Sequence, residues 1–498
     1  MLRKTIYTYH AGRNMRMELS TGLSENIKTI QSLLPIGESF DIITRELTFG
    51  RTAAYFVGIN GLCRTEVLQE IMSDLQNPVF VQTAEIENLE AFLRAKLGYA
   101  QVSLSDDFET IVLNVLSGPV ALFVDGFDRA VLIDVRTYPQ RGVKEPDMER
   151  ITRGARDGFV ETMLFNANLI RRRIRSCGLT FSIRHVGTES STDIAIAYME
   201  PLVNKSLLKL INDTLAELRV TSLTMGSQSL KELLLPAKWW APLPGIQMTE
   251  RPDVACSYLL EGHIVILVDN SPTALILPCT IFQFTQSPDD YYKSPSVGGY
   301  FRLIRFLCIP VNLLLMPLFL LFTTVFRAET ATWNLLTEGS VSAPRIFFYV
   351  MAVEFAIDLL KYSAALTDSR FSGSLSIVGG LLIGDIAVRL NWTSPEVLFY
   401  AGITLLTGIS LSTPEFADAL RLYRLFLLLA TGFFRLPGFC IGLLLILLSV
   451  IKTPTFGKMS YFWPLFPFER RALHNLLFRS PTAKAQPTDV WDRGVAKR

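Results

Sequence analysis

The distribution of apolar positions divides the chain into two halves. Residues 1–300 mix apolar with charged positions, whereas residues 303–451 contain long apolar runs. The clearest run, Leu303–Phe326, has 24 residues and one charge near its start. At about 1.5 Å per residue, a helix of this length crosses about 30 Å of hydrocarbon. We therefore predict a soluble N-terminal half followed by an α-helical membrane domain with several spans.

The other apolar segments are shorter or interrupted. They are Phe347–Tyr362, Ser376–Leu390, Val397–Leu411 and Leu420–Ile451. The last has 32 residues, and Arg435, Pro437 and Gly438 interrupt it. As one helix it would be about 48 Å long, too long for a bilayer, while each half alone barely spans one. We interpret it as either a kinked span or a tight hairpin.

The flanking charges predict the orientation. The first 20 residues contain no apolar run of the kind found in secretory signals, so we expect the first 300 residues to be cytoplasmic. After Ile451 the chain carries nine basic residues against three acidic ones, which is typical of a cytoplasmic tail. Both ends inside require an even number of crossings, and the segments allow four to six.

Ionisable residues within the apolar segments are candidates for an ion path. Glu354, Asp358 and Lys361 fall on one helical face, and Asp385 with Arg389 repeats the four-residue spacing in the next segment. A charge near the bilayer centre costs about 2.5 to 3.5 kcal/mol, so such groups face a bundle interior or water. The alternatives are that they form structural interhelix pairs, or that residues 347–362 lie along the interface as an amphipathic helix.

Two glycine pairs predict close helix packing. Gly380 and Gly384, and likewise Gly438 and Gly442, are spaced four residues apart. This spacing removes side chains from one helical face and lets another helix approach.

The soluble half contains an internal duplication. Residues 110–133 and 254–277 match at a constant offset of 144, which aligns Gly118 with Gly262 and Asp125 with Asp269. Each copy reads as a helical stretch, a β-branched run, a turn and a second apolar run, and so predicts a β-hairpin.

A second shared element precedes each hairpin. Strands are predicted at Thr52–Gly58 and Asp193–Met199, followed by helices at Glu66–Leu75 and Leu207–Leu218. We therefore expect the following organisation: an N-terminal lead (1–37), two similar α/β subdomains (38–141 and 150–290), a transmembrane helical domain (300–453) and a basic cytoplasmic tail (454–498).

A basic cluster ends the helical pattern that begins at Asn166. Its members are Arg171, Arg172, Arg173 and Arg175. Such a helix could contact acidic lipid headgroups or the acids of a neighbouring subunit, for instance those in Glu145–Glu149. The alternative is a solvated basic face.

Composition excludes several classes of function. The 48 basic and 46 acidic residues give a formal charge of +2, too small to attract nucleic acid over a distance. Six scattered cysteines and four dispersed histidines show neither a metal spacing nor a disulfide framework, so no cofactor is predicted.

The sequence also shows no catalytic motif. No phosphate-binding loop, nucleophile elbow or zinc helix is present, which favours a protein that is not an enzyme. The acid pairs Asp106–Asp107 and Asp289–Asp290 are interpreted as turn residues on solvated faces, and His263 as an exposed residue opening a strand.

Several colinear motifs carry a resemblance to one family. They are FDRAVLIDVRTYPQRGVKEPD (127–147), RGARDGFVETMLFNANLIRRRIR (153–175), TERPDV (249–254), EGHIVILVDNSPTALILP (261–278), SPDDYY (287–292) and SIVGGLLIGDIAV (376–388). Together they resemble the spore germinant receptor A subunits of endospore-forming bacteria, over about residues 40–468. The short N-terminal lead and the strand followed by Asn60-Gly61 are most similar to the family's paralogue from a stage V sporulation operon.

The resemblance implies a multi-pass protein of the spore inner membrane. It implies a B-type multi-spanning partner that binds germinant, often a lipoprotein C subunit, contact with membrane lipid, and assembly into a homo-oligomeric ring that conducts ions. It supplies no catalytic residues. Asp385 stands where relatives commonly have a neutral polar residue and Arg389 where an acid is usual, so relatives do not predict the ion selectivity.

Two functions follow as hypotheses. In the first, the chain is a membrane subunit of a spore germination complex that forms or supports an ion channel, with Glu354, Asp358 or Asp385 attracting cations. In the alternative, it is a non-conducting membrane scaffold that couples other germination proteins.

Overall fold

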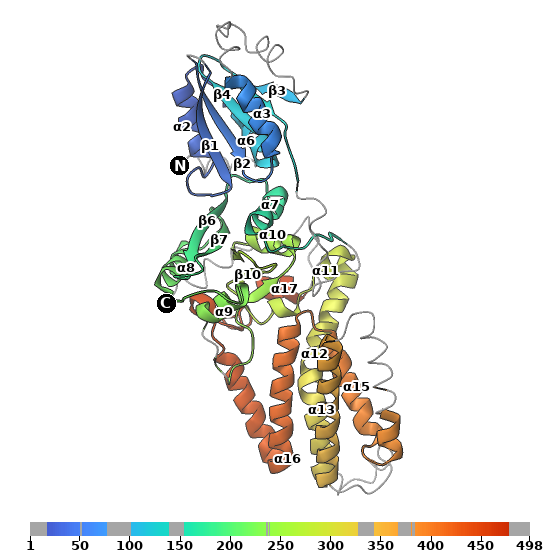
Figure 1. Ribbon diagram of the computed structural model, residues 1–498. Helices are drawn as coiled ribbons and strands as arrows, with labels where there is room; N and C mark the ends of the chain where they lie inside the picture. Colours follow the sequence, from blue (N-terminus) through green and yellow to red (C-terminus); the bar gives the residue numbers. More distant parts are fainter. Residues whose placement is uncertain are drawn as a thin grey trace. The chain divides into compact units, whose positions relative to one another are not determined.

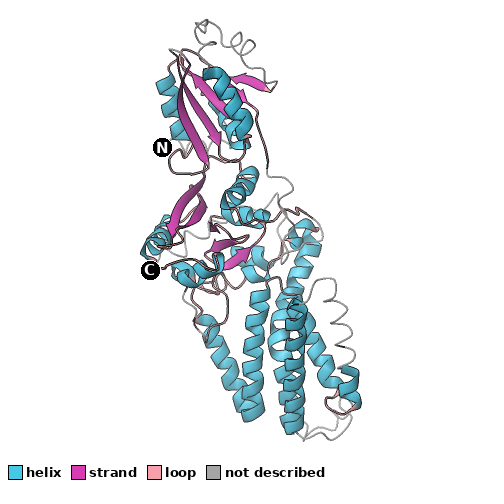
Figure 2. Cartoon of the chain, viewed as in Figure 1, coloured by secondary structure: helices cyan, strands magenta, loops and turns pink. Residues whose placement is uncertain are grey.

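The computed structural model describes residues 17–49, 52–76, 101–138, 154–235, 238, 240–326, 343–366, 380 and 384–477. The chain forms two compact units (Figure 1). Unit 1 contains the residues up to Pro236 and Ile246–Pro278, and unit 2 contains Ala237–Gly245 and the residues from Cys279 to Ala485. Strands occur in unit 1, whereas the described part of unit 2 is helical (Figure 2).

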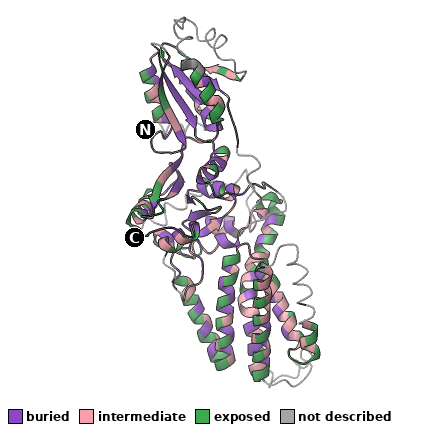
Figure 3. Cartoon of the chain, viewed as in Figure 1, coloured by how far each residue is buried: buried purple, intermediate pink, exposed green. Residues whose placement is uncertain are grey.

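The first half of unit 1 is a five-stranded antiparallel sheet with the order β1-β2-β4-β5-β3. Its strands are β1 (Ile42–Phe49), β2 (Thr52–Ile59), β3 (Val102–Ser105), β4 (Val120–Val124) and β5 (Ala130–Ile133). Helices α2 (Leu23–Leu33) and α6 (Phe108–Ser117) pack in one apolar cluster with the sheet, and α3 (Thr65–Gln76) packs in a second cluster. Side chains of β4 enter both clusters, so the sheet is covered on both faces and β4 is buried throughout (Figure 3).

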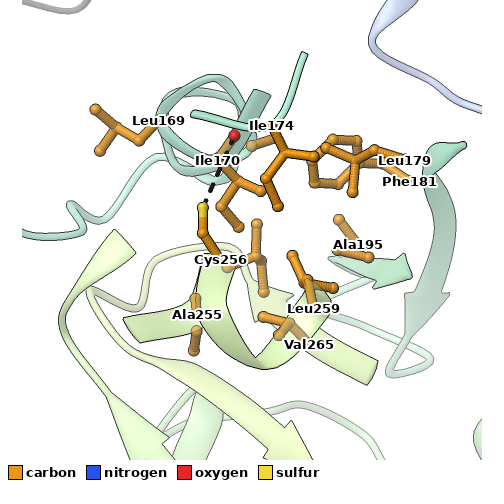
Figure 4. Packing of buried hydrophobic residues seen from close by; sticks show 14 of the residues in the cluster. Leu169, Ile170, Ile174, Leu179, Phe181, Ala195, Ala255, Cys256, Leu259 and Val265 are labelled. Carbon is orange, nitrogen blue, oxygen red and sulfur yellow. Dashed lines mark hydrogen bonds between the residues drawn. The ribbon is translucent and has the colours of Figure 1, made fainter. Parts of the chain in front are cut away.

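The second half of unit 1 repeats this plan with the order β6-β7-β9-β10-β8. Its strands are β6 (Leu179–Val186), β7 (Thr192–Met199), β8 (Gln247–Thr249), β9 (Ile264–Val268) and β10 (Ala274–Leu277). Its helices are α7 (Met163–Arg173), α8 (Lys205–Glu217), α9 (Ser227–Leu234) and α10 (Pro252–Leu260). Helices α7 and α10 share one core with the sheet, where the Cys256 thiol donates a weak hydrogen bond to the Ile170 carbonyl (Figure 4).

The identical strand order confirms the predicted duplication. The two hairpins, β4-β5 and β9-β10, occupy the same third and fourth places of their sheets. The predicted strands at Thr52–Gly58 and Asp193–Met199 are β2 and β7, and the helices predicted after them are α3 and α8.

The same hydrogen bond between a helix N–H and a hairpin aspartate occurs in both halves of unit 1. The Leu23 N–H at the start of α2 donates to Asp125 Oδ1 at 3.0 Å, and the Met163 N–H at the start of α7 donates to Asp269 Oδ1 at 3.0 Å. Neither helix has a side-chain cap of its own, so a distant hairpin turn satisfies a helix N–H that would otherwise lack an acceptor.

Equivalent glycines end the helices before each hairpin. Gly118 follows α6 with φ +113° and Gly262 follows α10 with φ +89°, both in the left-handed region. A Cβ at Gly118 would lie 2.8 Å from Arg136 Cγ, and one at Gly262 would lie 2.8 Å from the Leu202 carbonyl oxygen. Both the backbone angle and the space therefore require glycine at these two aligned positions.

A buried ion pair joins the two sheets of unit 1. Arg171 Nε of α7 donates to Asp41 Oδ2 at 2.7 Å, and both side chains are fully buried. The remaining Arg171 nitrogens donate to the carbonyls of Ser176 and Leu179. The prediction that Arg171 contacts lipid or a neighbouring subunit is therefore wrong, because its partners come from its own chain and leave it no exposed surface.

The other arginines of the basic cluster keep some exposure. Arg173 pairs with Asp157 at 2.6 Å and is half-buried, while Arg172 and Arg175 are exposed. The Arg172 guanidinium lies 4.7 Å from the centre of the Tyr138 ring.

His263 is buried, so the prediction of an exposed residue is wrong. Its Nδ1–H donates to the Pro278 carbonyl at 3.0 Å, and its ring meets the Tyr258 ring edge-to-face. Burial lowers the pKa of His263 to about 3, against which the backbone hydrogen bonds act only weakly. The ring is therefore neutral at any physiological pH.

The described part of unit 2 is built around four helices of 15 residues or more. They are α12 (Pro295–Leu321), which continues as a π-helical turn (Phe322–Phe326), α13 (Ala343–Leu366), α15 (Pro395–Ile409) and α16 (Pro414–Ile451). Short elements accompany them: η1 (Gln283–Thr285), α11 (Asp289–Tyr292), η4 (Phe456–Lys458) and α17 (Arg470–Leu477). Residues Pro295–Thr324 and α16 are long and apolar enough to cross a membrane, while α15 is shorter and α13 carries more charge.

The buried position of Asp290 corrects a third prediction. It is fully buried in the hydrogen-bonded turn of α11, where its carboxylate pairs with Arg305 and lies 3.6 Å from Arg302 Nε. It is thus not a solvated turn residue, because two arginines from the first turns of α12 neutralise it.

The long helix α16 folds back on itself. Arg435 has φ +53° and ψ −132°, which breaks the helix, and Pro437 two residues later cannot donate a backbone hydrogen bond. The Tyr423 hydroxyl lies 2.7 Å from Ser449 Oγ, although 26 residues of straight helix would separate them by about 39 Å. Of the two interpretations of this segment, the structure has the tight hairpin.

Because both halves of unit 1 have this capping contact, we predict that removing it from either half costs the protein a similar amount of stability. Replacing Asp125 or Asp269 by alanine removes the acceptor for a helix N–H, so each variant should lose about 1 kcal/mol of stability. Thermal unfolding of the full-length protein measures this loss. Asparagine at either position keeps an acceptor oxygen and serves as the control; equal losses for alanine and asparagine would contradict the capping role.

His263 predicts a pH-dependent stability. The unfolded chain binds a proton at the ordinary histidine pKa of about 6.5, while folded His263 does not until about pH 3. As pH falls from about 6.5, this residue should cost the folded state about 1.4 kcal/mol per pH unit. Above about pH 6.5 this loss of stability is absent, because His263 is neutral in both the folded and the unfolded chain.

Unfolding temperatures measured between pH 7 and pH 5 test this assignment. The loss should be smaller in His263→Gln than in the natural sequence. The matched control is His185→Gln, because His185 is exposed beside Asp193. Identical pH profiles for the natural protein and His263→Gln would contradict the assignment.

Candidate functional site

The buried charges of the helical unit form one network. Glu354 of α13 is 1% exposed. Arg424 of α16 binds its carboxylate with two bonds, Nε to Oε1 at 3.0 Å and Nη2 to Oε2 at 2.9 Å. A paired, bidentate geometry is what allows two charges to stay ionised away from water.

The same arginine reaches a third helix. Arg424 Nη1 donates to both the carbonyl and the side-chain oxygen of Asn312 in α12, at 3.1 and 2.9 Å. The Asn312 side-chain nitrogen donates in turn to the Thr404 carbonyl of α15 at 2.9 Å and to Thr407 Oγ1 at 3.2 Å. Three side chains thereby connect α12, α13, α15 and α16.

A second arginine completes the neutralisation. Arg421, one turn before Arg424, pairs with Asp358 and donates to the Glu354 carbonyl at 3.1 Å. Two carboxylates therefore face two guanidinium groups. Of the two acids, Glu354 is closed to water, while the Asp358 side chain is 42% exposed.

Little space remains around this network. A cavity of about 10 Å³ adjoins Asn312, Lys361, Thr404, Arg421 and Arg424, which is room for about one water molecule. Within the described residues, the interior of the helical unit at this level is therefore packed rather than open.

Glu354 and Asp358 thus occur as interhelix ion pairs, one of the alternatives that the sequence left open. Lys361, from the same helical face, lines the same small cavity. The two acids do not present unpaired charge to a passing cation in a single chain.

Asp385 and Arg389 lie in a different setting. They form a pair at 2.9 Å along one helical turn, with side chains 59% and 76% exposed. They contact no part of the Glu354 network, so the structure does not bring the four ion-path candidates together.

The two glycine pairs also lie in different surroundings, one tightly packed and one open. Gly438 and Gly442 lie where the two arms of α16 meet: a Cβ at Gly438 would collide with the Ala430 carbonyl, and one at Gly442 would lie 2.9 Å from Leu427 Cδ1. Among the described residues, no atom lies within 4 Å of a Cβ built at Gly380, and Leu398 Cδ1 lies 3.9 Å from one built at Gly384. The close approach therefore occurs within the hairpin.

Three important residues were missed by the sequence reasoning: Asn312, Arg421 and Arg424. A usable signal existed, because two arginines three residues apart stand at the start of an apolar run and share one helical face. The acids on residues 347–362, Glu354 and Asp358, are four residues apart, and spacings of three and four both place two side chains on one helical face. Complementary charges on two apolar helices are a recognisable pairing.

The arrangement is that of a protein with a duplicated α/β unit and a helical unit that has two helices of membrane-spanning length and hydropathy. A family model described as Bacillus/Clostridium GerA spore germination protein matches residues 28–489. The chain therefore belongs to the GerA family of spore germination proteins, which confirms the resemblance drawn from its motifs.

Two relatives identified by sequence, stage V sporulation protein AF and spore germination protein KA, agree with this assignment. Stage V sporulation protein AF of Bacillus subtilis is 32% identical over 471 residues, covering 94% of each chain. Spore germination protein KA of the same organism is 28% identical over 475 residues, covering 93% of this chain and 85% of the relative. The crystal structure of the N-terminal domain of the A subunit of the Bacillus megaterium spore germinant receptor GerK3 is 26% identical, with a TM-score of 0.41, and covers 53% of this chain and 97% of that one.

We predict that replacing a charged residue of the buried network costs more stability than replacing a charged residue of an exposed pair. Arg424→Met leaves Glu354 buried without its bidentate partner, so the variant should lose about 3 to 5 kcal/mol of stability. Glu354→Gln should also destabilise the protein, because it leaves the Arg424 guanidinium buried without a carboxylate partner. Thermal unfolding of the detergent-solubilised chain measures both losses.

Arg389→Gln is the control, since an exposed pair contributes about 0 to 1 kcal/mol. If Arg424→Met were no less stable than Arg389→Gln, the network would not hold the helices together.

Proposed function

We propose that this chain is a membrane subunit of a spore germination complex that oligomerises to form or support an ion channel, releasing ions during germination. Membership of the GerA family supports the role in germination. Two helices of spanning length and hydropathy support a place in the membrane. The names of the relatives are those of germination and sporulation proteins, which favours a role other than catalysis.

The observation that carries this proposal is the match of residues 28–489 to the GerA family of spore germination proteins. The place of an ion path is indicated by the neutralised Glu354–Arg424 network. It ties four helices into a packed bundle within one copy, and its cavity has room for about one water molecule. An ion path therefore forms between copies, where exposed groups line it. Asp358 is also partly exposed, but it pairs with Arg421 of another helix, whereas Asp385 and Arg389 are more exposed and pair only with each other along one helical turn among the described residues. We therefore assign Asp385 and Arg389 to the path, and Glu354 and Asp358 to its support.

Topology and partners complete the proposal. The chain lies in the spore inner membrane with unit 1 and the basic tail in the cytoplasm, and it works with a B-type multi-spanning subunit and further copies of itself. The hairpin of α16 returns the chain to the side from which it entered, which accommodates an even number of crossings and both ends inside.

Ion flux from liposomes tests the proposal. The full-length chain is reconstituted with its B-type partner, and potassium release is followed with an ion-selective electrode. Asp385→Asn should change the rate or the cation preference, because a carboxylate lining a pore concentrates cations.

Glu200→Gln is the matched control, since Glu200 also belongs to a partly exposed pair but lies in the α/β unit. If Asp385→Asn and Arg389→Gln both conducted potassium at the natural rate and with the natural cation preference, the assigned path would be wrong.

The alternative is a non-conducting membrane scaffold, and the packed, neutralised interior of the single copy is the observation that favours it. A scaffold would bind the B-type partner and give no flux under any condition in which the partner is functional. Co-purification without flux therefore distinguishes it from a channel subunit.

A further inference from the structure

A cavity of about 640 Å³ lies in unit 2, at the end of the helical bundle where α13 begins. Two segments line it: Arg345, Phe348, Tyr349 and Ala352 of α13, and Asn391 and Trp392 from the turn before α15. Figure 1 shows α15 beside α13, and the two helices are in contact. The cavity shares no residue with the buried charge network, and it has the volume of a small-molecule site.

One hydrogen bond holds the turn before α15 against α13. The Tyr349 hydroxyl donates to the Asn391 carbonyl at 2.7 Å. Asn391 has φ +53°, a left-handed conformation that asparagine adopts more readily than most residues. The Trp392 N–H donates to the Ala387 carbonyl at 2.8 Å. The backbone that carries Trp392 to the cavity is therefore fixed on both sides of Asn391.

Arg345 brings a positive charge to the cavity. It is exposed in the first turn of α13, and the ion pairs formed by the described residues of unit 2 do not include it. A guanidinium donates from a planar fork of N–H groups that matches two oxygens of a phosphate. Within the described part of the chain, this fork is therefore available to an anion.

The aromatic residues of the cavity are those of a membrane interface. Phe348 is 66% exposed and Trp392 is 67% exposed. Tryptophan and tyrosine are enriched where lipid headgroups meet hydrocarbon, because the ring enters the apolar layer while its N–H or O–H stays with polar groups. A long arginine side chain beside them reaches the level of the phosphates.

An exposed apolar stripe runs along α13 from the cavity. Its members are Phe348, Ala352, Phe355, Leu359, Tyr362 and Leu366. Their spacings of three and four residues place them on one helical face. From Phe348 to Leu359 the helix rises about 16 Å, which is about half of the 30 Å of a bilayer's hydrocarbon core. The stripe therefore has the length that an acyl chain of one leaflet needs.

We propose that this cavity binds a phospholipid of net negative charge, with its phosphate on Arg345 beside Trp392 and an acyl chain along the exposed stripe of α13. A guanidinium without a carboxylate partner favours an anionic lipid over a zwitterionic one, because the anionic lipid neutralises its charge. The site rests on the membrane position proposed above, and it does not depend on whether the chain conducts ions.

Native mass spectrometry of the full-length protein in detergent tests the proposal. The anionic probe is dioleoyl phosphatidylglycerol. Dioleoyl phosphatidylcholine has the same chains without the net charge, dioleoylglycerol lacks the phosphate, and glycerol phosphate lacks the chains. The expected result is saturable binding of phosphatidylglycerol that is tighter than that of the other three. Glycerol phosphate binding as tightly as the lipid would overturn the proposal, because a free phosphate ester would then be the ligand.

Variants locate the bound lipid. Arg345→Gln should weaken phosphatidylglycerol about tenfold or more, the usual effect of losing one charge-assisted contact. Arg345→Lys, which keeps the charge, should weaken it less. Ala352→Trp fills the cavity from an exposed position, so it should reduce the binding of phosphatidylglycerol without changing any charge.

The matched control is Arg435→Gln, because Arg435 is exposed beside Phe433 and Phe434 and does not line the cavity. Unfolding temperatures equal to that of the natural protein show that each variant is folded. An affinity that Arg345→Gln leaves unchanged, or that Arg435→Gln reduces equally, overturns the proposal. So does a change in the number of associated copies in Ala352→Trp with lipid binding unchanged, since the face would then belong to a neighbouring copy.

Flotation with phosphatidylcholine vesicles separates this inference from the membrane position on which it rests. A chain that floats with the vesicles but binds no phosphatidylglycerol saturably contradicts the lipid site alone. A chain that does not float contradicts both the membrane position and the lipid site.

Discussion

A carboxylate placed among apolar helices must find a positive partner or lose its charge. In this chain the Glu354 carboxylate is met by Arg424 with two hydrogen bonds, and the surplus donor of Arg424 reaches Asn312, which reaches Thr404. Because each of these residues lies on a different helix, one electrostatic requirement fixes the mutual placement of four helices. Buried apolar residues of the same helices, among them Val350 and Leu428, form one cluster and fill the remaining space.

Unit 1 also contains a buried ion pair between distant parts of the chain. Arg171 and Asp41 lie 130 positions apart and meet without any exposure to water, which joins the two halves of unit 1. The duplicated aspartates of the hairpin turns cap the helices α2 and α7 in the same way. In both units, polar contacts between distant parts of the chain determine specificity, while burial of apolar strands supplies the driving force.

The sequence predicted what depends on local pattern. Alternation and turn chemistry indicated the hairpins, and the shared offset indicated the duplication, since aligned residues such as Gly118 and Gly262 serve the same backbone geometry. It could not predict contacts that form only in the folded chain. Arg171 read as a surface residue because its partner Asp41 lies 130 positions away, and His263 did so because the Pro278 carbonyl meets it only across the folded second half of unit 1. For the same reason the sequence showed the acids of α13 without the arginines of α16, and left kinked span and hairpin as equal alternatives for residues 420–451.

Glu354 and Arg424 act as one unit that holds the helices together, and a double-mutant cycle measures the coupling between them. Unfolding free energies are compared for the natural chain, Glu354→Gln, Arg424→Gln and the double variant in the same detergent. The double variant should lose clearly less than the sum of the two single losses, with a coupling energy of about 0.5 to 3 kcal/mol. Additive losses, with no coupling between the two positions, would contradict it.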